Sequence, residues 1–181
     1  AFPIPDEMPG EEAAGFFIPF LTAWIGLVRR AQITPQDTVL VLGASGSSGC
    51  AAVQLAKAKG ARVIAVAGGP QKAEFCLGLG ADAVIDHRSQ DITASTMELT
   101  GGKGASLIYD PVGGKAGRAA FKATAFEGRF VVIGSSGSLG GAALTPAFDP
   151  PITGVVAPSC GAGVAMVGAV GDDDAGRHLR S

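Results

Sequence analysis

The sequence predicts an α/β fold, a doubly wound parallel sheet, on three observations. Short apolar runs rich in β-branched residues alternate with helical segments of about ten residues. The first apolar run is uninterrupted, as expected of a central parallel strand that is covered on both faces. A glycine-rich turn follows that run directly, at the point where a helix should begin.

The chain opens with an expected helical lead-in over residues 1–36. Apolar residues between Glu11 and Arg30 follow a helical pattern, with acidic residues at the start and basic residues at the end, which suits the helix dipole. Pro19 should break or restart this helix. A turn at 34–37 then separates the lead-in from the first strand.

Residues 37–137 should form the sheet and its covering helices. The strands are expected at 39–42, 62–66, 83–85, 106–109 and 130–133. The helices are expected at 49–59, 70–79, 91–99 and 115–125. Strands that alternate with helices in this way specify a parallel sheet with right-handed crossovers, which is a Rossmann fold.

Composition and charge exclude several classes of partner. There are 14 Lys and Arg against 16 Asp and Glu, a net charge of −2, and no basic run exceeds Arg29–Arg30. We therefore expect no nucleic-acid partner. The 3 cysteines form no CxxC or His pairing, so we expect neither a disulfide framework nor a metal site, and we expect a cytoplasmic protein.

Residues 138–181 form a Gly- and Pro-rich segment of low charge, whose structure the pattern does not define. Between residues 130 and 171 the only charged side chain is Asp149. The uncharged stretch 150–171 is long enough to span a bilayer, but its prolines, glycines and few large aliphatic residues make insertion weak. We expect no membrane partner, and the N-terminus has no signal-peptide pattern.

The sharpest functional signal is the turn after the first strand, which reads AxGxxG from Ala44 and differs by one residue from the dinucleotide fingerprint GxGxxG. Ala44 suits a tight turn, Gly46 the close approach of backbone to a pyrophosphate, and Gly49 the packing of helix on strand. The N-terminus of the helix offers free N–H groups to phosphates. Ser47 and Ser48 add hydroxyl donors. A plain cluster of loop glycines is the alternative.

The end of the second strand decides which dinucleotide is expected. A cofactor with a free 2′-hydroxyl usually meets an Asp or Glu there, but residues 67–72 contain neither. Lys72 and the helix start at Pro70 offer positive charge and donors to a 2′-phosphate. The sequence therefore predicts NADP(H) over NAD(H), and an ordinary surface lysine is the alternative for Lys72.

Several motifs, in order and at family spacing, carry a resemblance to a known family. They lie at residues 38–46 (TVLVLGASG), 51–57 (AAVQLAK), 79–86 (LGADAVID), 109–114 (YDPVGG) and 128–134 (GRFVVIG). The chain resembles the zinc-independent medium-chain dehydrogenase/reductase superfamily, and within it the zeta-crystallin-like quinone oxidoreductases and their enoyl-reductase relatives. The match runs from about Pro5 to Gly137 and lacks the family's N-terminal substrate domain, so the chain looks like a cofactor domain alone.

The resemblance implies roles for individual residues. The cofactor-binding residues that it implies are Ala44, Gly46, Ser47, Ser48, Gly49, Gly68, Lys72, His87, Val112, Gly113, Gly114, Gly134 and Ser135. Lys72 would hold the 2′-phosphate. His87 would lie beside the adenosine ribose, with a loop histidine as the alternative. Val112 to Gly114 and Gly134–Ser135 would lie beside the nicotinamide half of the cofactor. Ser48 stands where the family usually has a small apolar residue.

The resemblance also implies the chemistry, which is metal-free hydride transfer from NADPH to a conjugated carbon of a quinone, enone or enoyl thioester. An enoyl reductase domain of a polyketide or fatty-acid synthase and a non-catalytic nucleotide-binding protein are the alternatives. Catalytic residues stay unknown, since Tyr109 is more simply a core residue and Asp110 a structural acceptor. Relatives often pair through the edge strand of this domain, so a homodimer is one candidate for an oligomeric state that the sequence leaves open.

Overall fold

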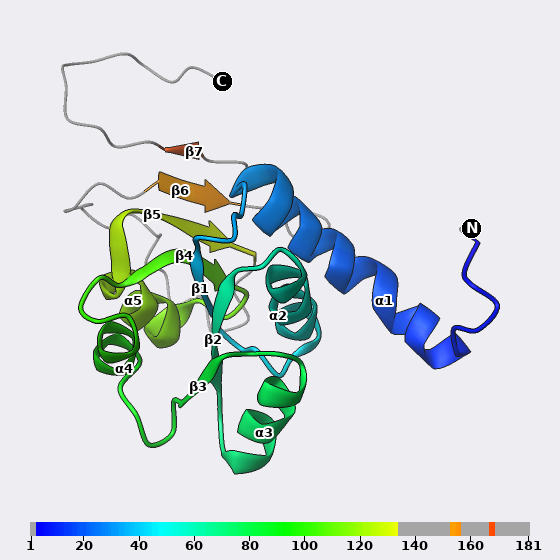
Figure 1. Ribbon diagram of the computed structural model, residues 1–181, viewed down its shortest axis with the longest axis horizontal. Helices are drawn as coiled ribbons and strands as arrows, with labels where there is room; N and C mark the ends of the chain where they lie inside the picture. The colour runs from blue at the N-terminus through cyan, green and yellow to red at the C-terminus, as the bar shows by residue number, and fades with distance from the viewer. Residues whose placement is uncertain (1–2, 134–152, 157–166, 169–181) are drawn as a thin grey trace.

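The computed structural model describes residues 3–133, 153–156 and 167–168. Its sheet has the strand order β3-β2-β1-β4-β5-β6-β7 (Figure 1). All neighbouring strands from β3 to β6 pair in parallel, and β7 runs antiparallel to β6. The chain moves outward from β1 in one direction and then from β4 in the other, which confirms the predicted doubly wound sheet.

The strands and helices lie close to their predicted positions. The strands are β1 (Thr38–Val41), β2 (Arg62–Ala67), β3 (Ala83–Asp86), β4 (Ala105–Asp110), β5 (Thr124–Val132), β6 (Thr153–Val156) and β7 (Val167–Gly168). The helices of the sheet region are α2 (Ser47–Ala58), α3 (Pro70–Gly78), α4 (Ile92–Leu99) and α5 (Gly114–Lys122). The largest difference is the start of β5, which pairs with β4 from Thr124 through a register shift.

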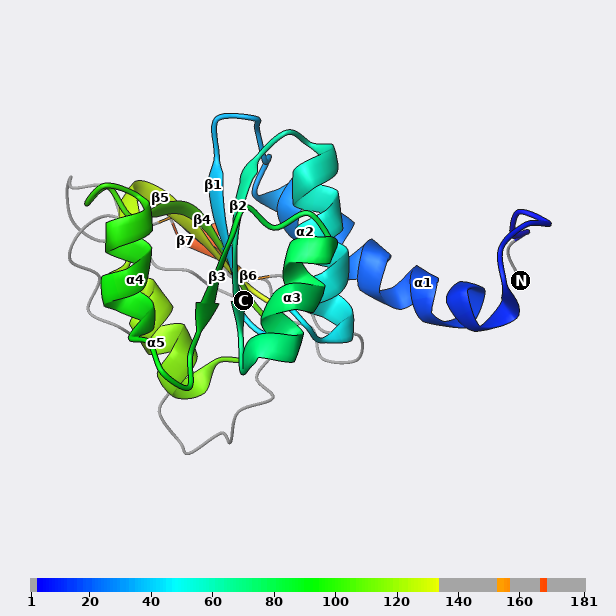
Figure 2. The same ribbon diagram turned by 60° about the horizontal axis from the view of Figure 1, so that its bottom comes forward.

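Helices cover both faces of the sheet. Figure 2 shows α2 and α3 on one side of the strands and α4 and α5 on the other. Successive strand residues face opposite sides, so Val39 and Val41 join the core beneath α2, while Leu40 and Leu42 join the core beneath α4 and α5. This two-sided burial explains why the strand reads as an uninterrupted apolar run.

The lead-in is one long helical element, and the predicted break at Pro19 is wrong. Helix α1 (Gly10–Ala23) contains Pro19 and continues directly into a π-helical segment, η1 (Trp24–Arg30). A proline removes only its own N–H bond and its ring strains one turn, and packing of the following turns fixes the helix axis. Gly26 allows this packing, because a Cβ there would lie 3.1 Å from the Ile133 side chain and 3.4 Å from the ring of Tyr109.

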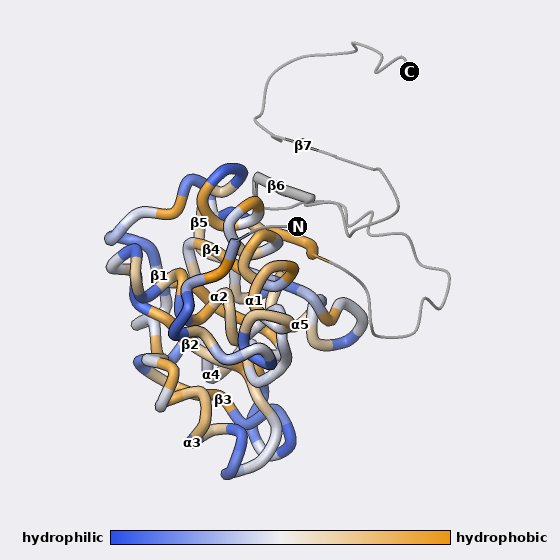
Figure 3. Tube along the Cα trace, turned by 90° about the vertical axis from the view of Figure 1, so that its right-hand side faces the viewer, coloured by the Kyte–Doolittle hydropathy of each residue, from blue (hydrophilic) through white to orange (hydrophobic). Residues whose placement is uncertain are grey.

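The outer part of α1 extends away from the body of the domain (Figure 1). Large apolar side chains of α1 and of the first residue of η1 are each at least 40% exposed, namely Phe16, Phe17, Ile18 and Leu21 in α1 and Trp24 in η1. Figure 3, in which α1 faces the viewer, shows hydrophobic residues along this helix. By length and composition alone, the helix over residues 10–30 could also cross a membrane. The sequence pattern had not identified this segment as a candidate span.

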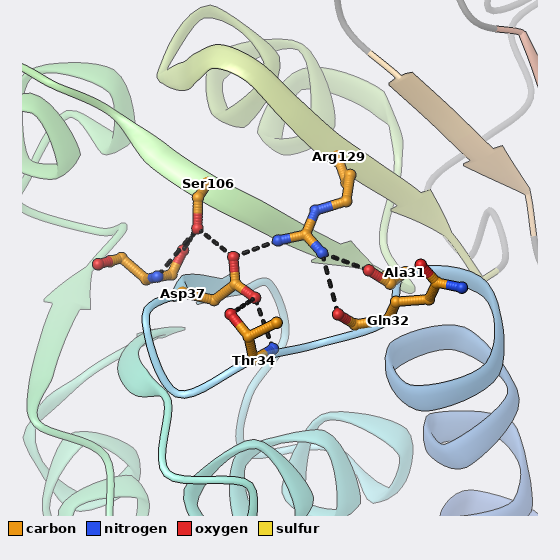
Figure 4. A network of polar contacts seen from close by, with 7 residues as sticks. Ala31, Gln32, Thr34, Asp37, Ser106 and Arg129 are labelled. Atoms are coloured by element: carbon orange, nitrogen blue, oxygen red, sulfur yellow. Dashed lines mark hydrogen bonds and ion pairs between the residues drawn. The ribbon is translucent and has the colours of Figure 1, made fainter.

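A polar network ties the lead-in to the amino-terminal edge of the sheet (Figure 4). Asp37, 5% exposed, accepts hydrogen bonds from the N–H of Thr34 at 2.7 Å and from the hydroxyl of Ser106 at 2.8 Å. Arg129 on β5 forms an ion pair with Asp37 and donates to the carbonyl of Ala31. The network therefore joins the loop before β1 to β4 and β5. It lies at the amino-terminal edge of the sheet, opposite the edge formed by the carboxyl ends of the strands.

The domain boundaries at 36 and 137 stay predictions of the sequence. Strands β6 and β7 fall within the segment 138–181 and continue the sheet beyond β5. The rest of that segment lies outside the described residues.

Candidate functional site

A cleft of about 700 Å³ opens at the carboxyl ends of the strands. Its walls come from the turns after β1, β2, β3 and β4 and from the first turns of the helices that follow them. The strand order reverses between β1 and β4, and ligands of open α/β sheets bind at such a switch point. The topology alone therefore makes this cleft the candidate site.

The glycine-rich turn forms the floor of the cleft beside the start of α2. The N–H of Gly46 donates to the carbonyl of Gly43 at 2.9 Å, and Gly43 has a φ of +57°, which favours glycine. No group in the described residues accepts the N–H groups of Ser47, Ser48 and Gly49. These free donors and the positive end of the helix dipole suit a phosphate.

Ser48 makes a contact that its sequence position did not predict. Its hydroxyl lies 2.7 Å from the hydroxyl of Tyr109, a fully buried residue of β4. Burial raises the pKa of Tyr109 to about 12, and the hydrogen bond from Ser48 offsets part of this rise. Ser48 thus lines the cleft and also anchors the turn to the neighbouring strand.

The turns after β2 and β3 meet at one end of the cleft. Lys72 on α3 and His87 after β3 both line it, together with Gly68. A Cβ on Gly68 would lie 2.8 Å from the Nε2 atom of His87, so a larger residue there would require the His87 side chain to shift. Asp86 at the end of β3 accepts a hydrogen bond from the N–H of Gly69 at 3.0 Å, so this carboxylate ties the turn after β3 to the turn after β2.

The turn after β4 is held by Asp110. One oxygen of this buried carboxylate accepts the N–H groups of Val112 and Gly113 at 2.8 and 2.7 Å. Burial raises the pKa of Asp110, although these two hydrogen bonds lower it in part. Gly117 makes room for the carboxylate, since a Cβ there would lie 2.4 Å from Oδ2. Asp110 acts here as a structural acceptor.

The structure separates the predicted site residues into three groups. Those that line the cleft are Gly46, Ser47, Ser48, Gly49, Gly68, Lys72, His87 and Val112. Those that do not line it are Ala44, Gly113 and Gly114. Ala44 is buried beneath the turn, where its N–H donates to the carbonyl of Val66, and Gly113 caps α5 instead. Gly134 and Ser135 lie outside the described residues.

The cleft also contains residues that the sequence pattern did not reveal. Lys115 on α5 adds a second lysine, and Gln90, Asp91 and Ile92 form a wall between β3 and α4. Their types are ordinary for a helix start, and Asp91 indeed caps α4 by accepting the N–H of Ala94 at 2.8 Å. No motif marks them, because only the fold brings them to the cleft.

A doubly wound sheet, a glycine-rich turn leading into a helix and a cleft at the switch point together define a Rossmann-type dinucleotide-binding domain. The particular family follows from comparison with known proteins. Residues 49–152 match the family described as zinc-binding dehydrogenase, and the chain belongs to this family. Its quinone oxidoreductase and enoyl reductase relatives confirm the superfamily that the motifs indicated.

Individual relatives are similar over most of this chain. A phenolphthiocerol/phthiocerol polyketide synthase of Mycobacterium tuberculosis is 38% identical over 147 residues, which is 78% of this chain and 7% of the synthase. The structure of Escherichia coli quinone oxidoreductase complexed with NADPH is 35% identical, with a TM-score of 0.71, over 78% of this chain and 44% of that one.

Two further structures show the range of the family. An NAD-dependent alcohol dehydrogenase is 39% identical, with a TM-score of 0.73, over 79% of this chain and 42% of its own. CurK enoyl reductase is 35% identical, with a TM-score of 0.70, over 76% of this chain and 41% of its own. This chain therefore spans less than half the length of each of these relatives. Its described residues contain no cluster of three or more His, Cys, Asp or Glu that could hold a metal ion.

Proposed function

We propose that this chain is the NADPH-binding domain of a zinc-independent oxidoreductase that reduces a quinone or an enone. The observation that carries the proposal is the cleft, which combines free N–H donors at the start of α2 with Lys72 and His87 at its other end. Gly46, Ser47 and Gly49 would hold the pyrophosphate, Lys72 the 2′-phosphate, and His87 the adenosine ribose. The cofactor is NADP(H), which the related quinone oxidoreductase binds.

When bound, NADPH would supply a hydride, one hydrogen with its electron pair, to the conjugated carbon of the acceptor, and the proton that completes the reduction would come from solvent. The residues of this chain would bind and orient the cofactor, and Ile92 and Val112 add apolar walls to the cleft. We assign no general acid to this chain. Tyr109 is hydrogen-bonded to Ser48 within the core, and Asp110 is occupied by backbone N–H groups.

The polyketide synthase and enoyl reductase relatives favour a second candidate, an enoyl reductase domain of a multidomain synthase. The two candidates share the hydride donor and differ in the acceptor. The cytoplasmic location, the homodimer and the lack of nucleic-acid or membrane partners stay predictions of the sequence.

Two measurements test the proposal. Fluorescence titration should give a lower Kd for NADPH than for NADH, and NADPH at a hundred times its Kd should add about 2.7 kcal/mol of stability. Equal binding of the two nucleotides would refute the NADPH assignment. NADPH oxidation by the full-length protein with 1,4-benzoquinone and with a crotonyl thioester then separates the two enzymes. Turnover of neither substrate would leave a nucleotide-binding protein without catalysis.

A further inference from the structure

Arg88 lies beside the end of the cleft that Lys72 and His87 line. Its Nε atom lies 3.0 Å from the point that a Cβ on Gly68 would occupy, and its Nη1 atom lies 3.2 Å from the same point on Gly69. The guanidinium therefore crosses the backbone at the end of β2, where the start of α3 meets the cleft.

Asp86 fixes this arrangement. Its Oδ1 atom accepts the N–H of Arg88 and the N–H of Gly69, each at 3.0 Å. One carboxylate oxygen thus joins the turn after β3 to the turn after β2. These two hydrogen bonds hold the pKa of Asp86 below its usual value, so the carboxylate stays ionised and keeps both turns in place at neutral pH.

The side-chain donors at this end of the cleft are uncommitted. Within the described part of the chain, the side chains of Arg88, Lys72 and His87 make no hydrogen bond or ion pair with protein groups. The N-terminus of α3 adds the positive end of a helix dipole beside them. Asp86 supplies one negative charge beside Arg88 and His87, and the positive charges and side-chain donors of Arg88 and Lys72 exceed it, so this end of the cleft is suited to a phosphate.

We propose that Arg88, positioned by Asp86, is a second ligand of the 2′-phosphate and a residue that determines the preference for NADPH over NADH. The proposal rests on the proposed function. A guanidinium can donate two parallel hydrogen bonds to a phosphate, whereas Lys72 offers a point charge. NADH carries a neutral hydroxyl at the same ribose position, so Arg88 contributes little to its binding.

The test compares ligands that differ only in the 2′-phosphate. Binding of NADPH, NADH, 2′,5′-ADP and 5′-AMP is measured by titration on the full-length protein and on its Arg88→Gln and Arg88→Lys variants. Arg88→Gln should weaken NADPH and 2′,5′-ADP roughly 10- to 100-fold and leave NADH and 5′-AMP unchanged. Arg88→Lys should weaken binding of the phosphorylated ligands less than Arg88→Gln does. Lysine keeps the positive charge but cannot donate two parallel hydrogen bonds as a guanidinium does.

Arg118→Gln is the matched control, since it removes the same charge from an exposed residue of α5 that does not line the cleft. This variant should bind all four ligands like the wild type. An Arg88→Gln variant that keeps the wild-type preference for NADPH overturns the role of Arg88 and leaves the proposed function intact. A wild-type protein that binds neither dinucleotide overturns both. Circular dichroism confirms that each variant is folded.

Discussion

Gly49 occupies a position where a side chain does not fit. A Cβ there would lie 2.3 Å from the carbonyl oxygen of Gly43 and 2.7 Å from the Cα of Ala44. Both obstacles are backbone atoms, so no rotamer change relieves the contact. The third small position of the AxGxxG turn is thus fixed by the packing of α2 on the end of β1, which also sets where the free N–H groups point.

Gly49→Ala should therefore lower the free energy of unfolding by about 1–3 kcal/mol, as overpacking does elsewhere, and weaken NADPH binding. Gly78→Ala is the control, because a Cβ meets nothing within 4 Å there and alanine suits a helix better by up to about 1 kcal/mol. Urea unfolding measures both variants. Equal stability of the Gly49→Ala variant and the wild type would contradict the packing argument.

Tyr109 is the chain's only tyrosine, so its ionisation can be followed by ultraviolet absorbance. Burial raises its pKa to about 12, whereas a tyrosine in the unfolded chain titrates near 10. The folded protein therefore holds a proton that the unfolded chain loses. The contribution of Tyr109 to stability should be complete below about pH 10 and lost as the pH rises toward 12.

Tyr109→Phe should remove this alkaline loss of stability, since phenylalanine does not titrate. Urea unfolding at pH 8, 10 and 11 measures the effect on both proteins. A tyrosinate signal that appears near pH 10 in a protein still folded by circular dichroism would show that the hydroxyl is not buried.

At the scale of the elements, the lead-in and the sheet are held together by polar contacts as well as by apolar packing. Asp37 is buried, and its carboxylate forms an ion pair with Arg129 on β5, which lies four strands further along the chain. A buried charge that loses its partner is costly, whereas an exposed pair contributes little. The chain contains both cases, because the pair Lys57–Asp82 is more than 30% exposed on each side.

Arg129→Met should lower the free energy of unfolding by roughly 3 kcal/mol, because it leaves the Asp37 carboxylate without its cation. Lys57→Met should cost less than about 1 kcal/mol. The Kd for NADPH should stay unchanged in both variants, since neither residue lines the cleft. Chemical denaturation and nucleotide titration check the two expectations. A large loss of NADPH affinity in Arg129→Met would show that the amino-terminal edge of the sheet is coupled to the cleft.

At the scale of the whole molecule, α1 is apolar on several sides and yet largely exposed in this chain. Such a helix is usually covered by protein or lipid. The continuation of the helix argues against lipid, because Gly26 and Leu27 of η1 are buried against the sheet and Arg29 and Arg30 follow them. Crossing a bilayer would require this half of the helix to leave the core.

Trp24, the chain's only tryptophan, tests this expectation directly. It is 44% exposed, and the ammonium of Lys59 lies 5.1 Å from the centroid of its ring. Acrylamide should quench its fluorescence readily, and phosphatidylcholine vesicles should leave its emission maximum unchanged. A blue shift with vesicles that protects Trp24 from acrylamide would instead identify α1 as a membrane-binding helix.

The local pattern of the sequence was sufficient for most of the fold. Apolar β-branched runs, Ala-rich helices and glycine stops depend on neighbours in the chain, so strands β1 to β4 and helices α2 to α5 lie where they were predicted. Pro19 misled the prediction, because the helix is held by tertiary packing on the sheet after the proline. The tail gave no readable pattern, and β6 emerges only through its pairing with β5.

The sequence by itself determined the glycine-rich turn that leads into α2 and predicted a role for Lys72, because each depends on residues that are adjacent in the chain. Only the tertiary structure brought Asp86 and Arg88 of the turn after β3 against Gly68 and Gly69 of the turn after β2. The parallel register that pairs Ala67 with Asp86 creates this contact. The sequence could show that no carboxylate directly follows β2. The charges of Asp86 and Arg88 reach the cofactor cleft only because β3 lies beside β2 in the sheet.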